Sequence, residues 1–194
     1  MKITIKDITE ENLDDIPRPC RSCLYWELPE DFKKLRQQNK PQLAEEKKKE
    51  WFVETLGEFG NCGKIVYQDK TPIGYAQFAP LSCLPQASNY ESGPHGRIED
   101  NTVFLSCLYI SEDRQRGNGI GGKLLDTVIA DLRDRSFKAV ETFARRGSAH
   151  NPSGPIELYL KKGFKIKDET DLKFPLIRRE FQYLQEQRSP VRVD

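Results

Sequence analysis

Alternating hydrophobic and polar positions predict strands and helices in a mixed order along the chain. Residues 2–8 (KITIKDI) alternate like a half-buried strand, and the turn-rich DKTP separates two apolar runs that would form an antiparallel hairpin. The continuous apolar run VFLSCLYI is typical of a buried strand. Strands are therefore predicted at residues 2–8, 63–68, 72–78, 103–110, 138–144, 164–169 and 173–181.

Helical spacing appears in three other stretches. Residues 40–57 predict an amphipathic helix with Gly57 near its end, and a second helix follows the glycines at 117–122 and runs to about Asp134. A short third helix is closed by Gly163. Residues 12–38 contain three prolines and cannot form one long helix, and residues 85–101 have loop chemistry. We expect one α/β domain over residues 1–184, with a frayed tail at 185–194.

Composition limits the classes of function. The 194 residues include 31 Lys and Arg against 30 Asp and Glu, so the overall field favours neither nucleic acid nor an anionic membrane. No apolar run is long enough for a membrane span, and the N-terminus lacks an export signal. The simplest interpretation of the five cysteines is therefore that they are reduced thiols of a cytoplasmic protein. The charged run at 45–50 (EEKKKE) is expected to be a solvated helix face.

The stretch EDRQRGNGIGGKLL (112–125) suggests a phosphate-binding loop. Gly117, Gly119 and Gly122 fit G-x-G-x-x-G, but six residues separate the strand from the first glycine, which a dinucleotide fold does not allow. A P-loop would need Ser or Thr where Leu124 stands. Both interpretations fail.

A third interpretation takes Arg116, Gly119 and Gly121 as R-x-x-G-x-G between a strand and a helix. In this form the stretch resembles the GNAT acetyltransferase family, whose acetyl-CoA site has that layout. Glycines let a pyrophosphate approach the backbone, and the N–H groups of the following helix point at it. Arg114, Arg116 and Lys123 would add cationic contacts. A surface loop with solvated charges is the alternative.

The resemblance spans about residues 3–181. ELYLKKGF (157–164) is similar to the family's second signature, in which a tyrosine precedes K-x-G-F. The fold it implies is a single-domain α/β structure. A mixed, mostly antiparallel central sheet would carry a splayed pair of strands, with helices on its flanks.

The resemblance also implies a reaction, the direct N-acetylation of a primary amine on a small molecule or protein. Acetyl-CoA would be the acyl donor, the Leu108 N–H would polarise the thioester carbonyl, and Tyr159 would protonate the departing thiolate. A core tyrosine is the alternative for Tyr159. The CoA-binding residues that it implies are Leu108, Tyr109, Ile110, Arg114, Arg116, Gly117, Asn118, Gly119, Ile120, Gly121, Gly122 and Asn151.

Two positions depart from the family pattern. Leu105 stands where some members carry a glutamate, so the general base is left to Glu141, to ordered water, or to one of three other candidates. Asn151 lies one residue before the usual asparagine position, which Pro152 occupies. The other candidate bases are Glu99, Asp100 and His150.

The pair Cys20 and Cys23 (CRSC) supplies only two of the four ligands of a structural zinc, so no metal site is predicted. Tyr25 and Trp26, which follow, are expected either to line the acceptor pocket or to pack in an aromatic cluster. Two other functions stay open: a catalytically degenerate sensor that binds acyl-CoA, and a thiol or metal module built on CRSC. The sequence identifies no acceptor, and a homodimer, frequent in the family, is one assembly it allows.

Overall fold

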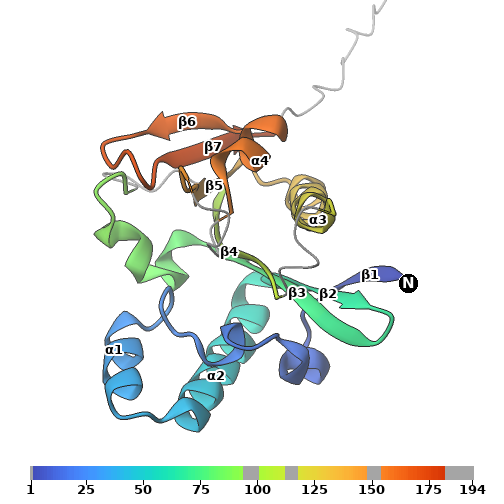
Figure 1. Cartoon of the computed structure of the whole chain (residues 1–194), viewed down its shortest axis with the longest axis vertical. Helices are drawn as coiled ribbons and strands as arrows, with labels where there is room; N and C mark the ends of the chain where they lie inside the picture. Colours follow the sequence, from blue (N-terminus) through green and yellow to red (C-terminus); the bar gives the residue numbers. More distant parts are fainter. Residues whose placement is uncertain (1, 94–100, 112–117, 148–153, 182–194) are drawn as a thin grey trace, which may run out of the picture.

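The computed structural model describes residues 2–93, 101–111, 118–147 and 154–181. Its strands form one sheet in the order β1-β2-β3-β4-β5-β7-β6 (Figure 1). β4 and β5 run parallel, and the other neighbours are antiparallel. The predicted mixed, mostly antiparallel sheet is confirmed. The strands are β1 (Ile3–Asp7), β2 (Gly63–Gln68), β3 (Thr71–Ala79), β4 (Thr102–Ile110), β5 (Ala139–Phe143), β6 (Lys165–Asp168) and β7 (Leu176–Glu180).

Helices cover both faces of the sheet (Figure 1). α3 (Ile120–Asp134) and α4 (Ile156–Lys161) pack their apolar side chains into one core cluster, with alternate residues of the central strands. α2 (Pro41–Phe59) packs Trp51 and Phe52 into a second cluster on the other face, and α1 (Pro29–Gln37) lies beside α2. None of the described helices has the length and hydropathy of a membrane span.

α2 ends two residues beyond Gly57, which agrees with the prediction that Gly57 lies near its end. The helix runs through Gly57, which is exposed there, and stops at Phe59 before Gly60, whose φ of 85° breaks the helix. α1 and α2 both begin with a proline at the first helical position, where its missing N–H costs nothing. Residues 85–89, predicted as loop, form a short 3₁₀ turn. The expected tail at 185–194 lies outside the described residues.

Candidate active site

β4 is the strand at which the two halves of the sheet separate. β3 accompanies β4 as far as Ile110, whereas the described pairing of β5 with β4 runs only from Thr102 to Phe104. The register of β4 against β3 also shifts next to Gln77, which leaves Ser106 in a β-bulge. β4 and β5 therefore diverge from the level of this bulge onward, in agreement with the splayed pair of strands predicted from the sequence.

The strand residues expected to bind CoA follow the bulge. Leu108 and Ile110 are buried in the core on the α3 face, and Tyr109 packs against the opposite cluster. Ile110 also reaches the start of α3, because a Cβ added at Gly121 would lie 4.0 Å from its Cγ1. The end of β4 and the beginning of α3 thus form one corner of the molecule.

The glycines at the start of α3 leave room for a ligand. Gly119 caps the helix in the left-handed conformation (φ 76°), which favours glycine, and a Cβ added there would meet nothing within 4 Å. At Gly121 and Gly122 an added Cβ would make only ordinary contacts, at 3.7 Å or more. Since the fold itself does not require glycine at 121 and 122, their small size fits a group that approaches the helix N-terminus from outside.

Part of the expected loop is not described. Asn118 and Gly119 form the turn that leads into α3, and Ile120 is buried as its first residue. The predicted contacts that lie outside the described residues are Arg114, Arg116, Gly117 and Asn151, together with the candidate bases Glu99, Asp100 and His150.

Tyr159 of α4 is completely buried on the α3 face of the sheet. Its ring packs edge-on against Phe164, with the ring centroids 5.3 Å apart, and its hydroxyl group hydrogen-bonds with Thr142 of β5. Burial raises the pKa of Tyr159 well above the usual range of a phenol, although the Thr142 hydrogen bond acts in the opposite sense. The phenol is therefore protonated at neutral pH, beside the strand that diverges from β4.

Gly154 is in contact with the Tyr159 ring, and replacing it by alanine is expected to destabilise the protein by about 1–2 kcal/mol. Gly154 has a φ of 72°, and an added Cβ would lie 3.2 Å from Cε2 of Tyr159. Urea unfolding of Gly154→Ala against Gly122→Ala tests this, because the control position has ordinary contacts and helical φ. Equal stability of the two variants would contradict it.

The predicted base Glu141 lies on β5 opposite Phe104, before the two strands diverge. Its Oε1 accepts hydrogen bonds from Lys167 Nζ at 2.7 Å and from Arg178 Nη1 at 2.8 Å, and the side chain is buried. Two cations thus hold this carboxylate. These contacts favour a structural ion pair over the predicted role as general base.

Aromatic rings cover the diverging strands on the face that carries α2. Tyr90 stacks on Phe143, at the end of β5, with the ring centroids 4.2 Å apart and the planes inclined by 16°. Trp26 stacks on Tyr90 in turn and also contacts Phe104 of β4. Trp26 thus belongs to an aromatic cluster at the separation of the strands.

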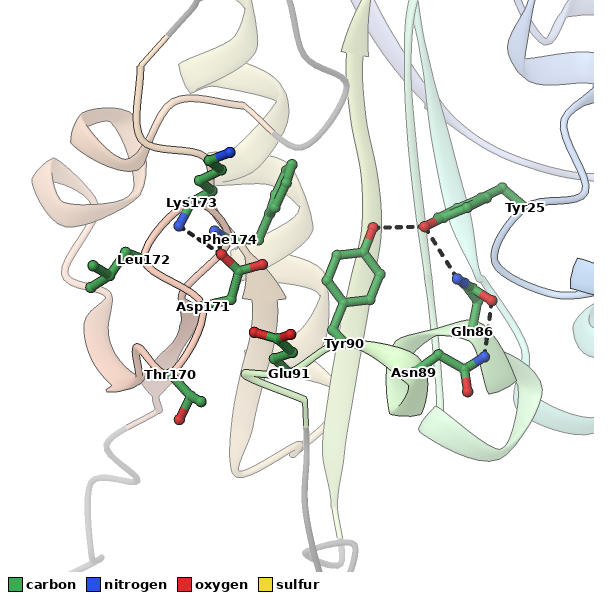
Figure 2. Close-up of a pocket in the computed structure, with 10 residues that line it drawn as sticks. All are labelled: Tyr25, Gln86, Asn89, Tyr90, Glu91, Thr170, Asp171, Leu172, Lys173 and Phe174. Carbon is green, nitrogen blue, oxygen red and sulfur yellow. Dashed lines mark hydrogen bonds between the residues drawn. The ribbon is translucent and has the colours of Figure 1, made fainter.

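A groove opens beside this cluster and encloses about 730 Å³ (Figure 2). Tyr25 and Tyr90 meet along one wall, their hydroxyl oxygens 2.9 Å apart, and Gln86 donates a hydrogen bond to the Tyr25 hydroxyl. Tyr25 therefore lines a groove, whereas its neighbour Trp26 is buried. The lining residues are Tyr25, Gln86, Asn89, Tyr90, Glu91, Thr170, Asp171, Leu172, Lys173 and Phe174.

Sequence patterns missed a buried charged network on the same face. Lys48, expected on a solvated helix face, is buried and donates a hydrogen bond to the buried Glu27 carboxylate. The expectation failed because consecutive charges on a helix point in different directions, so one member of EEKKKE faces the sheet. The sequence offered one sign of this network: Glu27 directly follows the aromatic pair Tyr25 and Trp26, so a carboxylate stands beside residues that tend to be buried.

Cys20 and Cys23 are free thiols: Cys20 begins a short 3₁₀ turn, and Cys23 directly follows its end. Burial raises the pKa of Cys20 to about 12 and also raises that of Cys23, while the Lys48 ammonium group opposes both shifts. Both thiols are protonated at neutral pH, which does not favour the redox or metal interpretation of CRSC. Among the described residues, no three His, Cys, Asp or Glu side chains are grouped as a metal site requires.

The comparisons with known proteins agree with this architecture. Residues 21–164 match the acetyltransferase (GNAT) family. Because the match spans most of the chain, the protein belongs to this family. No curated protein matches the sequence.

Solved structures share the fold at low sequence identity. The PaiA N-acetyltransferase from Thermoplasma acidophilum, solved in complex with coenzyme A, is 18% identical with a TM-score of 0.60, and covers 93% of this chain and 100% of its own. Aminoglycoside acetyltransferase AAC(6')-Ib, also solved with coenzyme A, is 18% identical with a TM-score of 0.56. The match covers 97% of this chain and 100% of that enzyme. A GNAT family acetyltransferase from Brucella melitensis, in complex with acetyl-CoA, is 16% identical with a TM-score of 0.52. The match covers 94% of this chain and 90% of that protein.

Proposed function

We propose that the protein is an acetyl-CoA-dependent N-acetyltransferase that transfers an acetyl group directly to an amine. One observation carries the proposal: Gly119 leaves open space at the N-terminus of α3, next to the strand that diverges from β5, and Gly121 and Gly122 follow it without being required by packing. Family membership and CoA-bound structures of the same fold support it.

The described residues suit the two parts of CoA differently. Backbone N–H groups at Gly119–Gly122 would receive the pyrophosphate, with the helix dipole in the favourable sense. Backbone groups of Leu108–Ile110 would hold the pantetheine arm between the diverging strands. Arg114, Arg116, Gly117, Asn118 and Asn151 remain proposed contacts from the sequence.

When bound, acetyl-CoA would supply an activated thioester. The Leu108 N–H, just past the β4 bulge, would donate to the carbonyl oxygen and stabilise the negative charge that develops during attack. Tyr159 would give its proton to the departing thiolate as the C–S bond breaks, which balances the charge of the leaving group. The proton lost by the amine would pass to solvent, because Glu141 is held by two cations.

We place the acceptor in the groove of Figure 2, on the opposite face of the sheet from α3. Tyr90 lines this groove and stacks on Phe143 at the end of β5, so the groove lies next to the point at which β4 and β5 diverge. An amine that enters there would approach the thioester from the face opposite Tyr159. Acceptor and acetyl-CoA could then be bound at the same time, as a direct transfer requires.

Calorimetry with CoA and acetyl-CoA tests the donor half of the proposal. Gly121→Glu is expected to weaken binding of both by at least tenfold, because it adds a carboxylate where the phosphates would lie. The fold should tolerate this change, since negative charge at a helix N-terminus is stabilising and the position has room for a Cβ.

Gly57→Glu is the matched control, because Gly57 is exposed and has open space on α2. It should bind like the wild type. Absence of CoA binding by the wild-type protein would overturn the proposed function. Binding without turnover on any amine in a thiol-release screen would favour the CoA-binding sensor.

A further inference from the structure

A network of four buried side chains lies on the α2 face of β3 and β4. Lys48 donates hydrogen bonds to the Glu27 carboxylate and to Gln77 Oε1, the latter at 2.7 Å. Gln77 Nε2 donates to Glu27 Oε2 at 3.3 Å, and the Tyr75 hydroxyl group donates to Gln77 Oε1. The amide of Gln77 is therefore held by three partners and has one orientation.

Gln77 connects this network to the bulge of β4. It pairs with Cys107 across the two strands, and the register shifts at the next position of β3. The hydroxyl group of Ser106, the bulged residue, donates to the Gln77 backbone carbonyl oxygen at 3.1 Å. Any movement of Gln77 would thus displace Ser106 and Cys107, which directly precede Leu108.

Stability alone does not explain a buried ion pair at this place. Burying two charges removes their hydration, and replacement of such a pair by apolar side chains of similar volume often leaves stability unchanged or higher. Charged hydrogen bonds instead impose direction and distance on their partners. Burial is the largest single influence on Lys48 and acts to lower its pKa, but attraction by and hydrogen bonding to Glu27, together with the Cys23 and Cys107 side chains, raise the pKa overall. The ammonium group is thus charged at neutral pH.

We propose that Glu27 and Lys48 are positioning residues for acyl transfer. Through Gln77 they hold the β4 bulge, and with it the backbone N–H that polarises the thioester carbonyl. This role rests on the proposed function, because it assumes that the thioester binds beside the bulge.

The test uses the double variant Glu27→Leu/Lys48→Met and acetyl-CoA labelled with carbon-13 at the carbonyl. Polarisation of the carbonyl in the wild-type complex should move its NMR signal away from the free value, and the double variant should lose most of this change. Affinity for CoA, which lacks the carbonyl, should stay within about twofold. With an amine found by thiol release, kcat should fall by up to about 100-fold while KM for acetyl-CoA changes little.

Two further variants separate positioning from stability. Lys64→Met removes another buried lysine, which lies on β2 and pairs with Asp7 and with Asp131 of α3. Its ion pairs therefore lie on the opposite face of the sheet from Glu27 and Lys48, and β3 separates it from the bulge. This substitution should lower stability but leave the carbonyl signal unchanged. Gln77→Met keeps the ion pair and removes the link to it, so it should lose the signal as the double variant does, and it carries the test if the double variant does not fold.

The outcomes distinguish the two proposals. Tight CoA binding with a wild-type carbonyl signal in both the double variant and Gln77→Met would overturn the positioning role and leave the acetyltransferase proposal intact. A signal lost equally in Lys64→Met would assign the effect to general loss of stability and would also overturn it. Failure of the wild-type protein to bind CoA would remove both proposals.

Discussion

Replacing Tyr159 by phenylalanine is expected to lower kcat by about 100-fold or more while leaving the affinity for CoA unchanged. A general acid contributes about 10²–10⁴-fold to rate, and phenylalanine keeps the ring but removes the proton. The ring contact with Phe164 and the burial of the side chain would persist. Thiol release with an amine acceptor and calorimetry with CoA measure the two quantities separately.

The pH dependence gives a second readout for Tyr159. Because burial raises the pKa of its phenol well above the usual range, the acid is protonated throughout an assay from pH 6 to 9. No loss of activity in that window should arise from Tyr159. Tyr67→Phe is the matched control, since it removes a hydroxyl group that donates to Asp15 at 2.7 Å, far along β2 from the proposed acyl site. Unchanged kcat in Tyr159→Phe would assign the leaving-group proton to another donor.

Replacing Glu27 alone by leucine should destabilise the protein by about 3–5 kcal/mol, because the Lys48 ammonium group would stay buried without its carboxylate. Urea unfolding of the wild type, Glu27→Leu and the double variant Glu27→Leu/Lys48→Met measures the cost. The double variant should recover most of the lost stability, since no charge is then buried. A single variant as stable as the wild type would contradict the burial of this pair.

The stabilities of the wild type and of Glu27→Leu should also change with pH in opposite directions. In the wild type the pKa of Lys48 is raised, so its contribution is fully present below the pKa of an unfolded lysine and is lost only as pH rises through the higher folded value. In Glu27→Leu the attraction of the carboxylate is gone and burial is the largest influence left, so the pKa of Lys48 falls below that of an unfolded lysine, about 10.4. Its unfolded state then binds more protons, so stability should increase from pH 8 toward pH 10.

The fold could be predicted from the sequence because the hydrophobic positions of strands and helices repeat with different periods. Every predicted strand is present, because alternation reports which side of a strand meets a core. Helix ends were less accurate: Gly57 and Gly60 look equivalent in the sequence, yet only Gly60 takes a positive φ. Which glycine ends a helix depends on where the chain must turn, and that depends on packing.

The proposed CoA site was predictable for a related reason. A phosphate that approaches the backbone requires small residues at fixed spacing, and this requirement is visible in R-x-x-G-x-G without any knowledge of distant contacts. Tyr159 was indicated by its spacing from Gly163 and Phe164. Glu141 shows the limit, because its partners Lys167 and Arg178 lie on later strands that no local pattern joins to it.

The sequence by itself determined the class of fold and the position of a glycine-rich helix start, because both depend on periodicity and backbone size within short stretches. Only the tertiary structure decided the pairing of Glu27 with Lys48, the register shift that places Ser106 in a bulge, and the groove between Tyr25 and Phe174. Each of these joins residues far apart in the chain. Burial, which converts an ordinary lysine and glutamate into a network with one geometry, exists only after the sheet has formed.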